Sequence, residues 1–228
     1  MSEPKRCWLL ELDVEPYDHV WEMQHRLVEA RRAGRIPDVF LLLEHEPVIT
    51  LGRRGHESNI LAAPARLEEL GVIVRKVERG GDVTYHGPGQ IVGYPILRIH
   101  DHNLGASDYM HALEEVLIRV VGDLGITAYR RDGLVGVWTE GGKVAALGAR
   151  IQLGVSFHGF ALNVDPIMEH WRLIVPCGLT EPVTSMRQLL GRRVEVAEVR
   201  ARVRARFEEV FGVALQPVTW GEIEPLVG

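Results

Sequence analysis

Three strand-like runs stand close together in the second half of this chain, and they constrain the fold more than any other feature. They cover residues 134–138, 143–150 and 155–163, with a tight turn at residues 140–142 between the first two. Because a tight turn joins neighbouring strands in opposite directions, this stretch predicts an antiparallel sheet.

Helical patterns surround these strands. The clearest has apolar residues at helical spacing from Met110 to Leu124, with Ser107 as the expected N-cap and Gly125 as its end. Three further helices are expected at residues 17–33, 64–70 and 196–211.

More strands are expected earlier in the chain. Residues 39–43 and 48–51 predict a hairpin whose turn is His45-Glu46-Pro47, and residues 72–77 and 91–99 predict two further strands. This order of elements predicts an α+β fold in one domain over residues 1–228, with a mixed, mainly antiparallel sheet flanked by helices.

Charge and cysteine content exclude several classes of function. The net charge of −5 provides no positive field to hold a nucleic acid. No apolar run has the length of a membrane span, and residues 1–12 lack the pattern of a signal peptide. Two cysteines far apart in the sequence suit a reducing compartment, so we expect a cytoplasmic protein, and we expect it to be a monomer.

Clustered arginines are the only candidates for binding an acidic partner. We interpret each cluster as a solvated face. The clusters are Arg31, Arg32 and Arg35, then Arg53 and Arg54, and then Arg130 and Arg131.

Cys177 lies between Pro176 and Gly178. The proline fixes the chain and the glycine lets another group approach the sulfur, which is a plausible setting for a nucleophile. A buried structural cysteine is the other interpretation, and the local sequence alone favours it. Cys7 has no special neighbours, and we interpret it as structural.

Lys143 follows a Gly-Gly pair and opens an apolar run. Its local sequence favours an exposed hairpin lysine. If its ammonium instead lies near Cys177, it stabilises the thiolate and lowers the thiol pKa below the free value of about 8.5.

The segment RGGDVTYHGPGQ, residues 79–90, is rich in glycine. It lacks the Lys-Ser/Thr ending of a P-loop and the GxGxxG spacing, so ATP binding through such a loop is not expected. Its glycines allow a ligand to come close, and Tyr85 and His86 are its large side chains. His86 is either a ligand-facing or a hydrogen-bonded structural histidine.

The remaining histidines give no metal site. His100, His102 and His111 do not complete a known ligand spacing, and we interpret them as surface residues. A papain-like pair of Cys177 with His158 or His170 lacks the sequence signature of that family.

Four motifs in order resemble the lipoyl(octanoyl) transferase family, the octanoyl-carrier-protein:protein transferases. They are RGGDVTYHGPGQIVGYPI (79–96), GGKVAALGAR (141–150), FHGFALNV (157–164) and PCGL (176–179). The preceding TLGRRG (50–55) also fits, and the similarity extends over residues 39–186.

The resemblance implies the fold of the biotin and lipoate ligase catalytic domains. It implies that Cys177 becomes acylated and that Lys143 lowers its pKa. It also carries over a set of substrate-contacting residues. These are Arg79, Gly80, Gly81, Asp82, Val83, Thr84, Tyr85, His86, Ala146, Leu147, Gly148, Gly159, Phe160 and Ala161.

The resemblance further implies the substrates. The donor is octanoyl acyl carrier protein, which holds the acyl group on phosphopantetheine. The acceptors are lipoyl domains of the E2 subunits of 2-oxoacid dehydrogenases and the glycine cleavage H protein. Because the acyl group arrives as a thioester, neither ATP nor a metal is expected as a cofactor. Three alternatives stay open, namely an ATP-dependent lipoate or biotin ligase, a cysteine-dependent amidotransferase that moves octanoyl between two carrier domains, and a non-catalytic acyl- or carrier-binding module.

Overall fold

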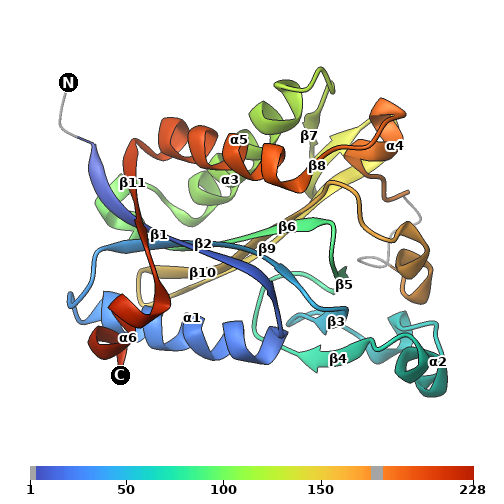
Figure 1. Cartoon of the computed structure of the whole chain (residues 1–228), viewed down its shortest axis with the longest axis horizontal. Coiled ribbons are helices and arrows are strands. Elements are labelled where there is room, and N and C mark those ends of the chain that lie inside the picture. Colours follow the sequence, from blue (N-terminus) through green and yellow to red (C-terminus); the bar gives the residue numbers. More distant parts are fainter. Residues whose placement is uncertain (1–3, 176–181) are drawn as a thin grey trace.

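A computed structural model describes residues 4–175 and 182–228 (Figure 1). Its main element is a large sheet. The strands of that sheet are β1 (Lys5–Glu15), β2 (Asp38–His45), β6 (Gln90–Ile96), β7 (Tyr129–Arg131), β8 (Leu134–Thr139), β9 (Gly142–Gln152), β10 (Val155–Asn163) and β11 (Val213–Val218). Over the described ranges the sheet has eight strands in the order β11-β1-β2-β6-β10-β9-β8-β7.

The sheet is mixed and mainly antiparallel, as predicted. Within the described residues of this sheet, only β1 pairs in parallel, with β11 on one side and β2 on the other. β8, β9 and β10 form the antiparallel ladder expected from the three consecutive runs, and β6 joins them to β2.

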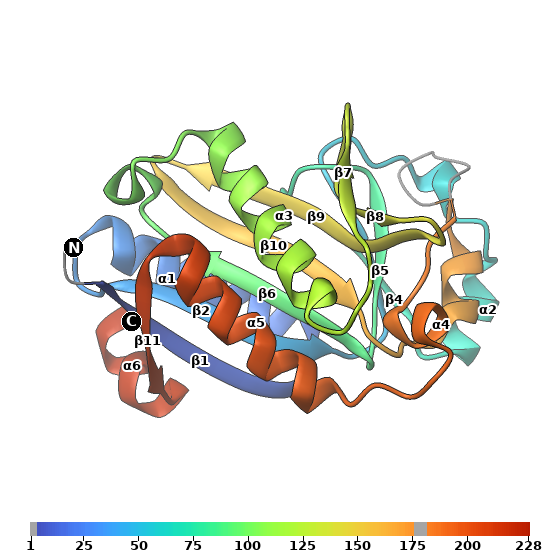
Figure 2. The same cartoon turned by 90° about the horizontal axis from the view of Figure 1, so that it is seen from above.

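Two pairs of helices cover the two faces of the large sheet (Figure 2). One face carries α3 (Ala106–Gly122) and α5 (Val196–Phe211), and the Phe207 ring of α5 stacks on Phe40 at 4.0 Å between centroids. The other face carries α1 (Tyr17–Arg32) and α6 (Trp220–Val227). The predicted helix 196–211 is confirmed.

The prediction of Ser107 as an N-cap is wrong. The N-cap of α3 is Gly105, and its backbone N–H donates to the carboxylate of Asp108 at 3.2 Å. Ser107 lies inside the first turn. An acidic residue three positions into the helix supplied the cap in place of a hydroxyl at its start.

A second, three-stranded sheet lies beside α1 and near α2 (Pro64–Glu69) (Figure 1). Within the described residues it has the order β4 (Ile73–Lys76), β3 (Val48–Leu51) and β5 (Val83–His86). The predicted hairpin of residues 39–43 with 48–51 is therefore wrong. β1 and β6 occupy both edges of β2, so β3 pairs with β4 and β5 instead.

The remaining helices of the described chain are short. They are α4 (Met186–Leu190) and three 3₁₀ helices at Glu57–Asn59, Ile99–His102 and Met168–Leu173. No helix among residues 4–175 and 182–228 is long and apolar enough to cross a membrane.

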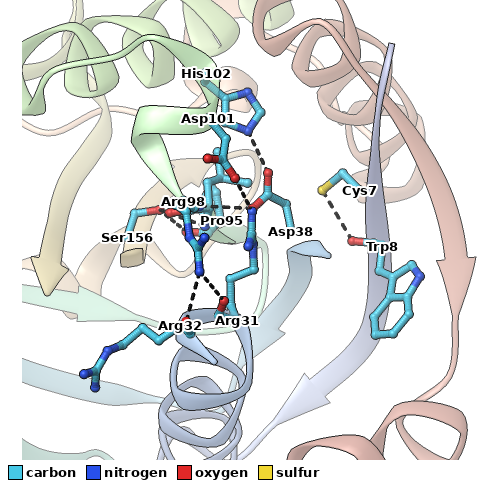
Figure 3. Close-up of polar contacts among 11 residues, drawn as sticks. Cys7, Trp8, Arg31, Arg32, Asp38, Pro95, Arg98, Asp101, His102 and Ser156 are labelled. Carbon is cyan, nitrogen blue, oxygen red and sulfur yellow. Dashed lines mark hydrogen bonds and ion pairs between the residues drawn. The ribbon is translucent and has the colours of Figure 1, made fainter. Parts of the chain in front are cut away.

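A buried polar network ties α1 to the start of β2 (Figure 3). Asp38 accepts hydrogen bonds from Arg31 Nε at 2.6 Å, from His102 Nε2 at 2.7 Å and from the backbone N–H of Arg98 at 3.0 Å. Arg31 also donates to Asp101 at 2.7 Å. The interpretation of Arg31 and His102 as surface residues is therefore wrong, because Asp38 holds both side chains inside.

Cys7 is structural, as predicted. Its side chain is fully buried in the core beneath α3 and α5. Burial raises the pKa of its thiol well above the ordinary value, so the thiol stays protonated and unreactive at neutral pH.

Candidate active site

A cavity of about 570 Å³ opens where the glycine-rich segment crosses β9 and β10. The crossing is fixed by a backbone hydrogen bond from Gly80 N to Ala149 O at 3.1 Å. Most of the residues predicted to contact substrate line this cavity. They are Arg79, Gly80, Gly81, Asp82, Thr84, His86, Ala146, Leu147, Gly148, Gly159, Phe160 and Ala161, together with Lys143.

Val83 and Tyr85 lie on the other face of β5, because successive side chains of a strand alternate. Both pack into an apolar cluster with Ile49 and Trp171. The Tyr85 hydroxyl is 2.7 Å from Nδ1 of His170. We therefore expect these two residues to support β5 rather than to touch an occupant of the cavity.

Glycine at position 148 is required by close packing. A Cβ there would lie 2.8 Å from Gly80 O and 3.3 Å from the Arg79 side chain. The glycine-rich segment can thus rest directly on the backbone of β9, which brings both walls of the cavity together.

Arg79 is a buried cation at the edge of the cavity. Its guanidinium donates to the Thr50 carbonyl at 2.6 Å, to the Thr50 hydroxyl at 2.9 Å and to the Asp82 carbonyl at 2.7 Å. The Asp82 carboxylate in turn accepts from Asn59 Nδ2 at 2.6 Å and from His56 N at 3.3 Å. These bonds fix the glycine-rich segment against the loop after β3.

Lys143 is not an exposed hairpin lysine. It is 8% exposed, and its stem lies along the cavity wall. Its Nζ donates to the Val135 carbonyl at 3.2 Å and lies 4.6 Å from the centre of the Trp138 ring. A carbonyl and an aromatic face both stabilise an ammonium, so the site holds a cation at one end of the cavity.

Four aromatic or imidazole side chains form the deep part of the wall, and we call them the floor: Tyr17, His86, Tyr94 and His158. Burial lowers the pKa of both histidines, and for His86 the nearby His45 and Arg79 lower it further. Both imidazoles are therefore neutral at pH 7. A floor of uncharged rings suits an uncharged acyl chain.

His158 has an unusual position within the floor. It adopts a left-handed backbone conformation, with φ of 52°, inside β10. Neither of its ring nitrogens has a hydrogen-bond partner among the described residues. Glu78 Oε1 is 3.7 Å from Nε2, which is too long for a hydrogen bond.

Sequence reasoning missed part of the floor. Tyr17 and Tyr94 look like ordinary core aromatics in the sequence, and His158 was weighed only as a partner for Cys177. Tyr94 falls within the motif of residues 79–96, whose predicted substrate contacts end at His86. Extending those contacts to the end of the motif would have included Tyr94.

Cys177 and Gly178 lie outside the described residues. The described residues on both sides of them are attached to the site. Val175 N donates to Asn59 O at 2.8 Å, and Lys143 N donates to Pro182 O at 2.9 Å.

The described part of the chain contains no group of three or more His, Cys, Asp or Glu side chains arranged to hold a metal ion. His100 and His111 are exposed, as expected, whereas the His102 side chain is hydrogen-bonded to Asp38.

The sequence of the whole site region matches a known family. Residues 16–208 match the model of the lipoyl protein ligase A/B catalytic domain. The chain belongs to this family. Relatives in it that are named octanoyltransferase include those of Gloeobacter violaceus, 46% identical over 93% of both chains, and Solibacter usitatus, 45% identical over 93% of this chain and 96% of the relative. The chain is thus a member of the octanoyltransferase branch, whose shared name is that of an acyltransferase.

Solved structures of lipoate and biotin ligases share the fold. Lipoate-protein ligase A bound with ATP superposes with a TM-score of 0.73 at 15% identity, covering 98% of this chain and 92% of the other. A putative lipoate protein ligase from T. acidophilum gives 0.72 at 14% identity, with the same coverage. A biotin protein ligase from Aquifex aeolicus gives 0.50 at 15% identity, covering 91% of this chain and 70% of the other. The predicted ligase-like α+β fold is confirmed.

Proposed function

We propose that this protein moves an octanoyl group from acyl carrier protein to a lysine of a lipoyl carrier domain, with Cys177 as the nucleophile and Lys143 as its cationic partner. The observation that carries the proposal is the position of the Lys143 ammonium in the wall of a cavity lined by the family's motif residues. The names of the relatives support octanoyl as the acyl group.

The first half-reaction forms an acyl-enzyme. The Cys177 thiolate attacks the thioester carbonyl, and the bond to the phosphopantetheine sulfur breaks. Lys143 gives a proton to that sulfur as it leaves, so the free thiol departs and the lysine becomes neutral.

The second half-reaction restores the enzyme. The amine of the acceptor lysine attacks the acyl-cysteine, the carbon–sulfur bond breaks, and neutral Lys143 takes the proton that the new amide releases. Thiolate and ammonium are then both regenerated. The thioester supplies the activation, so no step consumes ATP.

The neutral floor supports an aliphatic acyl chain. Seven carbons beyond the carbonyl contribute about 6 kcal/mol on burial, at roughly 0.8 kcal/mol each. One methylene more or less changes binding little, so we expect a preference for octanoyl with tolerance of its near neighbours. The acceptors proposed are the lipoyl domains of E2 subunits and the glycine cleavage H protein.

Intact-mass analysis tests the proposal. Wild-type protein mixed with octanoyl acyl carrier protein, without ATP, should gain one octanoyl group, and Cys177→Ala should gain none. Cys7→Ala is the matched control, because Cys7 is buried in the core, and it should acylate like wild type. Lys143→Met should slow acylation strongly, since it removes the group proposed to protonate the leaving thiolate.

The same experiment separates the alternatives. An ATP-dependent ligase would modify the acceptor domain from octanoate and ATP, and it would do so equally well with Cys177→Ala. A non-catalytic binding module would form no adduct at any time. An adduct on wild type that also forms on Cys177→Ala would remove Cys177 from the mechanism.

A further inference from the structure

Two arginines that follow β3 lie against the glycine-rich segment. Arg53 N donates to Arg79 O at 3.0 Å and Arg54 N donates to Gly81 O at 3.1 Å, while both side chains are exposed. The backbone bonds hold these cations at a fixed place on the rim of the cavity.

Arg150 of β9 reaches the same rim. It follows Ala149, whose carbonyl accepts from Gly80 N at 3.1 Å. A second cavity of about 340 Å³ is lined by both Arg53 and Arg150, and it shares Gly80, Met110 and Ala149 with the first one. The two cavities are therefore neighbours, with the cationic one at the surface.

These cations differ from most arginines of the protein. Surface arginines such as Arg75, Arg119 and Arg206 are ion-paired with carboxylates. Arg53 and Arg150 have neither an ion pair nor a side-chain hydrogen bond to any residue within 4–175 and 182–228.

Among the described residues that line the second cavity, one carries a carboxylate. This residue is Glu78, but its Oε1 lies 2.9 Å from His25 Nε2 and accepts a hydrogen bond from Trp21 Nε1 at 3.2 Å. The rim thus keeps a positive charge in a protein whose net charge is −5. A small anion is the ligand that such a place favours.

We propose that Arg53 and Arg150 bind the phosphate group of the donor's phosphopantetheine arm. The proposal rests on the proposed function. Guanidinium groups match phosphate oxygens in a bidentate geometry. Arg150 is seven positions after Lys143 along β9, a separation of roughly 24 Å.

The length of the arm agrees with that separation. The arm is about five peptide units long, roughly 17 Å when extended. The reach of the arginine side chains covers the remainder. The thioester can therefore lie beside Lys143 while the phosphate contacts the arginines, and the acyl chain is left to occupy the floor.

A binding experiment tests this site without any turnover. In NMR titrations, wild-type protein should bind phosphopantetheine at least about tenfold more tightly than pantetheine, the effect expected of a charge-assisted hydrogen bond. The double variant Arg53→Gln/Arg150→Gln should lose that preference. Arg6→Gln, which removes an exposed arginine at the start of β1, should retain it. Equal binding of the two ligands to wild type, or a preference that survives in the double variant, would overturn the proposal.

Free phosphate is the other source of the same chemistry. Titration with inorganic phosphate separates the two sources, because the arm adds contacts inside the cavity. Phosphopantetheine should bind more tightly than inorganic phosphate. If the two bind equally, the rim is a simple anion site and the assignment to the arm fails.

Transfer rates distinguish this proposal from the proposed function. With octanoyl-phosphopantetheine as donor, the double variant should lose about tenfold or more in kcat/KM, and with octanoyl-pantetheine it should match wild type. Equal losses with both donors would refute the phosphate site and leave octanoyl transfer standing. If wild type binds phosphopantetheine through the arginines but transfers no octanoyl group, the phosphate site stands and the proposed function is refuted.

Discussion

Lys143 is attached through its own backbone to Pro182, the first described residue after the PCGL motif. Lys143 N donates to Pro182 O at 2.9 Å, and Lys143 O accepts from Thr184 N at 3.0 Å. Asn163 of β10 adds a side-chain hydrogen bond to Thr184 O at 2.9 Å. The chain that leaves the motif is thus held in register with the lysine by main-chain bonds.

Gly142→Ala should break this register. Gly142 has φ of 119°, and a Cβ there would collide with the carbonyl of Pro182. The variant must strain the backbone or push residues 182–184 away from β9. We expect a loss of about 1–3 kcal/mol in the free energy of unfolding, measured by urea denaturation, and a clear loss of octanoyl transfer.

Gly122→Ala is the matched control. It adds the same methyl group at the last residue of α3, where a Cβ meets nothing within 4 Å and φ is not positive. Alanine favours helix, so stability should stay equal or rise by up to about 1 kcal/mol. Wild-type stability and transfer in Gly142→Ala would contradict the role given to the glycine.

Ala146→Val should shift the acyl-chain preference toward shorter chains. Ala146 lines the cavity from β9, and two added methyl carbons narrow it there. Each carbon that no longer fits removes about 0.8 kcal/mol of binding, a factor of roughly four in kcat/KM. Competition between butanoyl and octanoyl donors measures the shift. The butanoyl rate is the internal control, and an unchanged ratio would place the acyl chain elsewhere.

The sequence predicted the local parts of the fold and missed those that depend on distant partners. The β8-β9-β10 ladder follows from a tight turn and alternating residues, which are local signals. The parallel pairing of β1 with β11 joins Lys5 to Val213, and no local pattern encodes it. The hairpin of residues 39–43 with 48–51 failed for the same reason, since the competing strands β1 and β6 come from elsewhere in the chain.

In the site, too, residues marked by local motifs were predicted and residues placed by distant contacts were not. Lys143 and the glycine-rich segment were found because short motifs carry them. The contact between Asp38 and His102 joins residues 64 positions apart, so His102 looked like a surface histidine. Tyr17 contributes to the floor only because α1 packs beneath the large sheet.

Asp38→Asn should destabilise the protein strongly at pH 7. Burial disfavours the ionised carboxyl, but hydrogen bonds from His102 and Arg31 outweigh it and lower the pKa of Asp38 below its ordinary 3.8. Removing the charge leaves Arg31 buried without its closest partner, at a cost of about 3–5 kcal/mol. Urea denaturation measures this loss.

The sign of the pH dependence follows from the lowered pKa. The carboxylate contributes fully above pH 3.8, and its contribution disappears as the pH falls through the lower folded-state value. The gap between wild type and Asp38→Asn should therefore close in acid. Asp18→Asn, at an exposed pair with Arg75, should cost no more than about 1 kcal/mol. An Asp38 effect as small as this would show that the network is not stabilising.

In His45→Gln the free energy of unfolding should fall less between pH 7 and pH 4.5 than it does in wild type. His45 is fully buried, and burial lowers its pKa from 6.5 to about 4. Nδ1 lies 3.0 Å from the Glu15 carbonyl, which can only accept, so Nδ1 carries the proton. Nε2, at 2.8 Å, then accepts from the Tyr94 hydroxyl and is not available for a second proton.

In the unfolded chain His45 binds a proton once the pH falls below 6.5, whereas in the folded protein it does not until about pH 4. Proton binding therefore stabilises the unfolded state across this window, by about 2–3 kcal/mol at pH 4.5. Glutamine has no such titration. The free energy of unfolding of His45→Gln, measured at several pH values, should fall less than that of wild type by this amount. Because both proteins share every other titrating group, parallel curves would mean that His45 takes up its proton equally easily in the folded and unfolded states.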